Sequence, residues 1–526
     1  MTPRQALLKW PSYRLFPYER ELARREAASL LHCQPSDSED GLLVELNGHP
    51  NEVLGRLTYF REVQISDGTS LVPTQATLEA SAQGPRASTR QSTRYSAHGL
   101  HEYRGKFNPQ IVRAIGNLLD LEDESAVLDP FCGSGTTLLE CLHSDWHAVG
   151  IDLNPLAVAI ANAKLSFVRA SSRRIKADTA RLSAHARETA SHRDFSRAWT
   201  PKEIATLLGG SGSDPTLENA EYLARWIQPS VMAQLVWTLN AIEKLAGQST
   251  RQIFRLVLSD LLRSASLQDP GDLRIRRRKD PSPNEPLLVK FADAIERNSA
   301  RVIEAKLALG SRSTRQRAVL SDSRDPRLVE RAALRCGAPI RAVISSPPYA
   351  TALPYIDTQR LSLCALGLVD WRRMNRVERQ LIGTRELTVT ERGRIEQRMQ
   401  TVPGSLHRVA KLCIEMMRAL SPADGFRRRN MPAVTFQYFE GMSAVLSSLP
   451  RVLGGGADLA FVVGPNTTTL GGRTFRVNTP HLLAEMSEML GWKVRDLLPL
   501  ETYQRFDIHN RNSIKSEALL LLRSAD

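Results

Sequence analysis

The sequence has few features of a metal-binding, disulfide-bonded or membrane-spanning protein. Its six cysteines form no Cys-x-x-Cys pair and no Cys/His spacing typical of zinc ligands, so we expect reduced thiols and no metal. No uninterrupted apolar run approaches the length of a membrane span, and the first residues, MTPRQALLKWPSYRLF, lack the apolar core of a signal peptide. These absences predict a cytoplasmic protein without a membrane partner.

Charge and length carry more information. The 526 residues have a net charge of +14 and a pI near 9.7, which favours a polyanionic partner. Charge alone does not separate nucleic acid from an acidic membrane surface. The length allows two or three packed units, and an apolar content of 42% is enough for an ordinary core.

Residues 126–155 follow the pattern strand, glycine turn, helix, strand. The apolar run Ala126-Val127-Leu128 is followed by Gly133-Ser134-Gly135, after which three leucines recur at helical spacing. Glycines let a backbone approach a ligand closely, and the start of the next helix offers unpaired N–H groups. A second apolar run ends at Asp152, where nucleotide-binding folds hold ribose hydroxyls. The pattern predicts a cofactor site.

Longer motifs in this region resemble those of the S-adenosylmethionine-dependent amino-methyltransferases of DNA. Residues 129–137 (DPFCGSGTT) resemble the cofactor motif of that family, and residues 150–155 (GIDLNP) resemble its next motif. Far downstream, an apolar run leads into residues 346–349 (SPPY), which look like the family's catalytic tetrapeptide. The resemblance covers about 97–166 and 315–524. It implies an α/β fold: a Rossmann-like class I methyltransferase sheet with a large helical insertion and a small N-terminal α+β module.

The same resemblance implies which residues hold S-adenosylmethionine. In the family, a segment before the glycine motif closes over the methionine end of the cofactor, and residues 106–110 (KFNPQ) resemble it. The strand that ends at Ser321-Asp322-Ser323 resembles one that brings an acid or a hydroxyl to the adenine ring; a simple turn is the alternative. The expected cofactor-binding residues are Phe107, Asn108, Asp129, Pro130, Phe131, Gly133, Gly135, Thr136, Asp152, Leu153 and Asp322.

The tetrapeptide suits the methylation of an exocyclic amine. Such an amine is conjugated to its ring and is a poor nucleophile, so its lone pair must be localised and aimed at the methyl group. By resemblance, the Ser346 hydroxyl and the Pro347 carbonyl accept the two amine hydrogens. Pro347 and Pro348 keep the turn rigid, and the Tyr349 ring stacks on a base rotated out of the duplex. Positioning then supplies most of the rate, without a covalent intermediate.

The type of base is inferred from the serine. Ser346 resembles the cytosine-N4 enzymes, whereas adenine-N6 enzymes more often carry an acid or asparagine at this place. We expect N4 methylation of cytosine in double-stranded DNA, with N6 methylation of adenine as the alternative. Cytosine C5 chemistry is disfavoured because no Pro-Cys nucleophile occurs. An RNA amino-methyltransferase and a non-catalytic DNA-binding scaffold are the remaining alternatives, and a cognate restriction or defence protein stays open as a partner.

The patterns divide the chain into four segments. Residues 1–92 predict an accessory module with either a DNA-facing or a packing role. Residues 93–168 and 315–526 predict the cofactor half and the catalytic half of the methyltransferase domain, and residues 169–314 a helical insertion that is a candidate for DNA recognition.

Local patterns add detail to these segments. We expect strands at 42–46 and 57–60, and a polar linker from 77 to 92. A charged helical excursion spans 370–430, a glycine- and threonine-rich loop spans 464–472, and a closing hairpin is expected from 492–498 and 517–522.

Two basic clusters are candidate contacts to DNA phosphates. Alternatively, both clusters are solvated charges on the surface, without a bound partner. Their members are Arg274, Arg276, Arg277, Arg278, Lys279, Arg427 and Arg428. His98 and His101 are expected at the surface or as caps, without a catalytic role, because methyl transfer to an amine needs no strong base.

Overall fold

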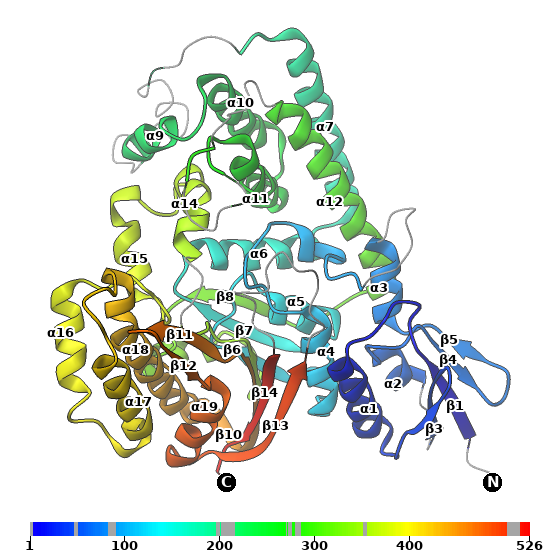
Figure 1. The fold of residues 1–526 in the computed structure, drawn as a ribbon. Coiled ribbons are helices and arrows are strands. Elements are labelled where there is room, and N and C mark those ends of the chain that lie inside the picture. The colour runs from blue at the N-terminus through cyan, green and yellow to red at the C-terminus, as the bar shows by residue number, and fades with distance from the viewer. Residues whose placement is uncertain are drawn as a thin grey trace.

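A seven-stranded, mostly parallel sheet lies at the centre of the computed structural model (Figure 1). The structure describes residues 4–46, 51–82, 91–195, 200, 216–269, 271, 276–278, 286–350, 355–501 and 516–525. The strand order is β13-β14-β10-β9-β6-β7-β8. The strands are β6 (Ala126–Asp129), β7 (His147–Asp152), β8 (Gln316–Leu320), β9 (Ile340–Ser345), β10 (Leu453–Val463), β13 (Lys493–Glu501) and β14 (Ser516–Arg523).

The chain builds this sheet outward in two directions from its middle. From β6 it continues to β7 and β8 on one side, and then to β9 and β10 on the other. β6 and β9 are parallel neighbours, with Leu128 opposite Val343, so the strand order reverses between them. In open α/β sheets, ligands bind outside the carboxyl ends of the strands at such a switch point. β14 closes the sheet as an antiparallel strand between β10 and β13, and the predicted Rossmann-like fold is confirmed.

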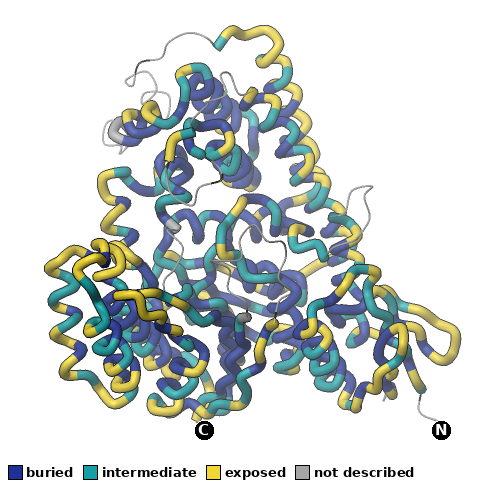
Figure 2. The backbone as a smooth tube through the Cα atoms, in the orientation of Figure 1, coloured by how far each residue is buried: buried dark blue, intermediate teal, exposed yellow. Residues whose placement is uncertain are grey.

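Burial explains why these strands read as continuous apolar runs. All four residues of β6 are buried, as are five of the six in β9. Parallel strands covered on both faces show this pattern in place of the alternation of a half-exposed strand. Figure 2 shows the buried centre of the sheet and the more exposed helices around it.

Helices cover both faces of the sheet. One face carries α4 (Pro109–Leu118), α5 (Thr136–His143) and α6 (Pro155–Arg169). The other carries α13 (Pro326–Ala333), α16 (Val389–Arg398), α17 (His407–Arg418), α18 (Phe426–Ser448) and α19 (Thr479–Met489). Met374 of α15 (Met374–Gln380) belongs to the core of the first face. Much of the predicted helical excursion at 370–430 thus shares one apolar core with Val343 of β9.

The insertion is helical, as predicted, and lies over α6 (Figure 1). Its helices are α7 (Ser172–His192), α9 (Thr216–Ala224), α10 (Pro229–Leu245), α11 (Gln248–Ala265) and α12 (Leu287–Leu309). α7 and α12 pack along each other through a buried hydrogen bond of 2.8 Å between Thr179 and Ser299. Beyond the insertion, α14 (Tyr355–Ala365) follows the catalytic loop and contacts α11. In the described part of the chain, no helix is both long enough and apolar enough to cross a membrane.

The N-terminal module has its own five-stranded antiparallel sheet, in the order β2-β3-β1-β4-β5. Its elements are β1 (Arg4–Lys9), α1 (Pro17–Leu31), β2 (Ser36–Ser38), β3 (Gly41–Leu46), α2 (Asn51–Arg56), β4 (Glu62–Ile65), β5 (Ser70–Leu71) and α3 (Thr74–Ala82). α1 packs on α4, where the buried Glu26 carboxylate accepts a hydrogen bond of 3.1 Å from Asn117. Arg25 also pairs with Asp496 of β13, so the module is fixed to two parts of the central α/β domain.

Three local predictions were wrong. Residues 57–60 are not a strand; they form the buried turn that leads into β4. Residues 77–82 belong to helix α3, while 83–90 of the expected linker lie outside the described residues. The expected loop at 464–472 is mostly a hairpin of β11 (Asn466–Leu470) and β12 (Arg473–Val477). Gly471 and Gly472 have φ of +52° and +80° in its turn, a geometry that suits a two-residue hairpin.

Candidate active site

The glycine turn between β6 and α5 has a backbone that other residues do not readily adopt. Gly133 and Gly135 have φ of +48° and +77°, in the left-handed region. A Cβ on Gly135 would lie 2.6 Å from the Cβ of Ala161 on α6, because the turn packs directly on that helix. Space and backbone angle therefore both require glycine at 135.

Asp152 joins the end of β7 to this turn. Its carboxylate accepts hydrogen bonds from the backbone N–H groups of Gly133, at 2.9 Å, and Asn154, at 2.8 Å. Burial raises the pKa of Asp152 to about 6, so the group is ionised at neutral pH. A carboxylate fixed in this way can still accept hydroxyl hydrogens from a ligand in front of it.

A cavity of about 670 Å³, including its mouth, opens at the carboxyl ends of β6, β7, β8 and β9. Six predicted cofactor residues line it: Pro130, Phe131, Gly133, Asp152, Leu153 and Asp322. Ser346 and Pro348 of the tetrapeptide line it as well, so the glycine turn and the tetrapeptide share one cavity.

A smaller cavity of about 290 Å³ shares several of these walls. It is lined by the predicted residues Phe107, Asp129, Phe131, Gly133, Thr136 and Ser346. Asn108 lies elsewhere: its side chain caps α4 by accepting from the backbone N–H of Gln110 at 2.9 Å, and it lines neither cavity. Gly135 also lines neither, and acts through the shape of the turn.

Hydrogen bonds hold the tetrapeptide against the glycine turn. The Ser345 hydroxyl donates to Asp129 at 2.6 Å, which links the catalytic strand to the first residue of the cofactor motif. Burial raises the pKa of Asp129 to about 6. The Ser346 hydroxyl donates to the carbonyl oxygen of Val462 on β10 at 3.2 Å. Because its hydrogen is used there, the lone pairs of Ser346 are left as acceptors.

The last two predicted catalytic residues occupy different surroundings. Pro347 is buried, and its side chain lines neither cavity. Tyr349 is half-buried, and its hydroxyl donates to the carboxylate of Glu517 on β14.

Asp322 faces the larger cavity but is already paired. Its two carboxylate oxygens accept from the Arg324 guanidinium, at 2.9 Å for Nε and 2.7 Å for the terminal nitrogen. The neighbouring Ser323 hydroxyl donates to the carbonyl of Pro130 at 2.6 Å, which ties the end of β8 to the glycine turn. Ser321 and Ser323 were not predicted as lining residues, although both flank the predicted Asp322.

Other lining residues were also missed. Tyr103 and Gly105 belong to the segment before the glycine motif, where the resemblance begins only at residue 106 and predicted Phe107 and Asn108. Leu381 and Ile382 come from the helical excursion at 370–430, and no motif marks them. Lys164 is fully buried behind the turn and donates to the carbonyl and hydroxyl of Ser134, at 2.9 and 3.1 Å; burial lowers its pKa to about 7.

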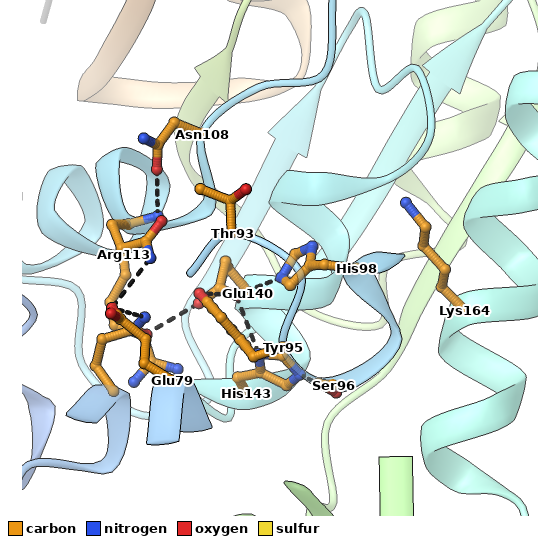
Figure 3. A network of polar contacts seen from close by, with 12 residues as sticks. Glu79, Thr93, Tyr95, Ser96, His98, Asn108, Arg113, Glu140, His143 and Lys164 are labelled. Atoms are coloured by element: carbon orange, nitrogen blue, oxygen red, sulfur yellow. Dashed lines mark hydrogen bonds and ion pairs between the residues drawn. The ribbon is translucent and has the colours of Figure 1, made fainter. Parts of the chain in front are cut away.

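A buried polar network fixes the segment before the glycine motif to α5 (Figure 3). The Glu140 carboxylate contacts His98 at 2.7 Å, His143 at 3.0 Å, and the Tyr95 hydroxyl and Arg113 at 2.9 and 3.1 Å. Burial alone would raise the pKa of Glu140, but the neighbouring His143 and Arg113 lower it well below its ordinary value. Burial lowers the pKa of both histidines, which favours their neutral forms beside the Glu140 carboxylate and the Arg113 guanidinium.

This network corrects one prediction and bears on another. His98 and His101 are buried, with exposures of 1% and 7%, and are not at the surface. In the described ranges, His98, Glu140 and His143 are the one group of side chains close enough together to hold a metal ion. Four side chains already contact the Glu140 carboxylate, so its lone pairs are used within a hydrogen-bonded network that stabilises the fold.

The basic clusters are only partly exposed. Arg274 and Lys279 lie outside the described residues. Arg276 and Arg277 are exposed; Arg277 donates to the Arg225 carbonyl, and Arg278 donates to the Gln268 carbonyl at 2.9 Å. In the second cluster, Arg427 and Arg428 are exposed at the start of α18, and Arg428 lies 3.5 Å from Asp424.

The strand order and the glycine turn define a Rossmann-like α/β fold of the kind that methyltransferases have. Residues 87–163 match a family described as DNA methylase, which comprises N6 and N4 amino-methyltransferases. The match confirms the predicted resemblance to these amino-methyltransferases and supports S-adenosylmethionine as the cofactor.

Several known proteins are similar to parts of this chain. The type II methyltransferase M.MjaII of Methanocaldococcus jannaschii is 42% identical over 72 residues, which are 13% of this chain and 13% of that relative. A putative DNA modification methylase of Thermus thermophilus, in complex with S-adenosylmethionine, is 12% identical over 25% of this chain and 51% of its own, with a TM-score of 0.16. The rRNA methyltransferase aviRa of Streptomyces viridochromogenes is 13% identical over 84% and 97% of the two chains, with a TM-score of 0.29.

Proposed function

We propose that this chain is a DNA methyltransferase that moves a methyl group from S-adenosylmethionine to the exocyclic amine of a base turned out of the duplex. The observation that carries the proposal is the single cavity lined by Gly133 and Asp152 on one side and by Ser346 and Pro348 on the other. A methyl donor held by the first pair lies next to an amine held by the second.

The cofactor supplies an activated methyl group on its sulfonium. The residues at the cavity fit such a ligand: the turn at Gly133 brings backbone close to it, the ionised Asp152 accepts from ribose hydroxyls, and Phe131 adds an apolar wall. Phe107, Asp129 and Thr136 extend the site through the adjoining smaller cavity. Asp322 is kept as the weaker contact, because Arg324 already occupies its carboxylate.

In the proposed reaction, the Ser346 oxygen and the Pro347 carbonyl accept the two hydrogens of the target amine. The lone pair of the nitrogen is then directed at the methyl carbon, the new N–C bond forms as the S–C bond breaks, and the nitrogen loses a proton to water. The hydrogen bond from Ser346 to Val462 supports the acceptor role, because it fixes the hydroxyl rotor with its lone pairs available. The ring of Tyr349 stacks on the extruded base.

Ser346 also supports cytosine N4 as the preferred target, with adenine N6 as the alternative. A serine hydroxyl is a neutral acceptor whose hydrogen is used by Val462, and it suits either amine sterically. The preference for cytosine therefore rests on the resemblance of SPPY to the tetrapeptide of the N4 enzymes.

The test is methyl incorporation by the full chain from labelled S-adenosylmethionine into unmethylated plasmid DNA, with a structured RNA in parallel. We expect incorporation into DNA, and N4-methylcytosine in its nucleoside digest. Ser346→Ala should lower kcat by about a hundredfold or more, the usual cost of one transition-state hydrogen bond, with unchanged cofactor affinity. Ser447→Ala, which removes an exposed hydroxyl on α18, is the matched control and should stay at the unaltered rate. Methylation of RNA alone, or full activity in Ser346→Ala, would contradict the proposal.

A further inference from the structure

A tyrosine and a glutamate from distant parts of the chain meet at the carboxyl edge of the sheet. Tyr349 follows the central strand β9, and Glu517 is the second residue of β14. The Tyr349 hydroxyl donates a hydrogen bond to Oε1 of Glu517. Because β10 lies between β9 and β14, the tyrosine side chain reaches across the end of β10 to make this contact.

The surroundings of Glu517 disfavour the ionised form of its carboxyl. Its side chain is half-buried, and burial raises the pKa of Glu517, while the hydrogen bond from Tyr349 lowers it. Within the described residues, no lysine or arginine forms an ion pair with Glu517, so Tyr349 is its main stabilising partner there. The hydrogen bond from Tyr349 offsets part of the cost of burying this carboxyl, and the carboxyl in turn fixes the Tyr349 hydroxyl.

The register of β14 fixes this acid in space. Ala518 pairs with Val463 at the end of β10, and Glu517 pairs with Leu500 of β13. The backbone of Glu517 is therefore paired with β13, one residue before the part of β14 that is paired on both sides, and its carboxylate is a fixed anchor for the ring.

Both polar ends of the tetrapeptide are thus held by the C-terminal strands. The hydroxyl of Ser346 is fixed by Val462 of β10, and the hydroxyl of Tyr349 is fixed by Glu517 of β14. A tyrosine ring has two side-chain torsions, and anchoring its hydroxyl end restricts both. Stacking on an extruded base costs less conformational entropy if the ring plane is already in place when the base arrives.

We propose that Glu517 is a positioning residue: it holds the ring of Tyr349 in the orientation in which the ring stacks on the extruded base. This inference rests on the proposed function, since it assigns Tyr349 to the base. Glu517 itself touches neither the base nor the cofactor in this role.

The test compares Glu517→Ala with Glu517→Gln in the plasmid assay, using the full chain. Glutamine keeps an acceptor oxygen at the same reach and should retain activity within about threefold. Alanine removes the acceptor and should lower kcat/KM for DNA about tenfold to a hundredfold, the usual range for one charge-assisted hydrogen bond. Cofactor affinity should not change in either variant. Glu501→Ala, an exposed acid at the end of β13, is the control for a lost charge and should match the unaltered chain.

A double-mutant cycle separates positioning from a general structural role. Tyr349→Phe keeps the stacking ring and removes the hydroxyl, so it should lose about as much as Glu517→Ala. If Glu517 acts through that hydroxyl, Tyr349→Phe/Glu517→Ala should be no worse than Tyr349→Phe alone.

The outcomes distinguish this inference from the proposed function. Full activity in Glu517→Ala, or a further loss when it is added to Tyr349→Phe, refutes the positioning role while methyl transfer to DNA stands. No incorporation by the unaltered chain refutes the proposed function, and the positioning role with it.

Discussion

Gly135→Ala is the substitution whose effect follows most directly from the geometry. A residue other than glycine at φ of +77° costs about 1 kcal/mol, and the new Cβ would also lie 2.6 Å from the Cβ of Ala161. Overpacking of this kind typically costs about 1–3 kcal/mol. The turn would therefore need about 2–4 kcal/mol to adopt its present conformation.

That cost should be seen in cofactor affinity. If only the present conformation binds, the apparent Kd rises by the inverse of its population, here about thirtyfold to a thousandfold. Titration calorimetry with S-adenosylmethionine measures this directly. Gly310→Ala is the control, because Gly310 at the end of α12 has φ of +68° with nothing within 4 Å of its Cβ position.

The control should bind the cofactor as the unaltered chain does. A compensating change sharpens the test: Ala161→Gly in the Gly135→Ala background removes the 2.6 Å contact but leaves the Cα of residue 161 at 2.9 Å, so part of the affinity should return. If Gly135→Ala bound the cofactor within about threefold of the unaltered chain, the reasoning from backbone angle and clash would be refuted.

Three further outcomes are expected. Because burial raises the pKa of Asp152 to about 6, its carboxylate becomes protonated as the pH falls through 6. Cofactor affinity should therefore drop up to tenfold per pH unit below that value. Asp152→Asn should bind the cofactor weakly and without this pH dependence, as measured by calorimetry from pH 5 to 8. Arg113→Met leaves the Glu140 carboxylate without its guanidinium and should cost about 3–5 kcal/mol, seen as a large drop in Tm that Arg113→Met/Glu140→Gln partly reverses. Arg427→Glu should weaken DNA binding and reduce the slope of log K against log salt by about 1. The same change at Arg335, before the amino end of β9, is the control and should leave the slope unaltered. Equal slopes in the two variants would mean that Arg427 is a solvated surface charge without a phosphate contact.

The parts of the site that could be predicted are those set by local sequence. Gly133 and Gly135 mark a turn after a strand, and SPPY follows another strand. Parallel strands present their carboxyl ends at one edge, so the two loops were expected to meet, and both do line one cavity. The position of Ser346 in the cavity wall follows from this rule. It can be predicted without knowing how the insertion between the two motifs folds.

The parts that could not be predicted depend on long-range register. Tyr349 and Glu517 are 168 positions apart, and their contact exists because β14 enters the sheet between β10 and β13 at one alignment. Side-chain periodicity gives no such alignment. The same applies to Leu381 and Ile382, which reach the cavity through the packing of α15 and its neighbours.

The missed hairpin has a different cause. Gly471-Gly472 between two short polar stretches is a hairpin signal, but residues 466–470 are Asn-Thr-Thr-Thr-Leu, and the apolar alternation that usually reveals a strand is absent. When neither face of a strand is extensively buried, only the residues of the turn indicate the hairpin in the sequence.

The separation of β7 from β8 along the chain affects how the protein is made. The two strands are partners in the sheet, yet β7 ends at Asp152 and β8 begins at Gln316. Ribosomes add about 5–20 residues per second, so synthesis of the ~160 residues between them takes roughly 8–30 s. During that interval the nascent chain carries β6 and β7 with both outer edges unpaired, since β9 also arrives late. The helices of the insertion can form by local contacts as they emerge, whereas the first two strands keep aggregation-prone edges until the rest of the sheet is translated.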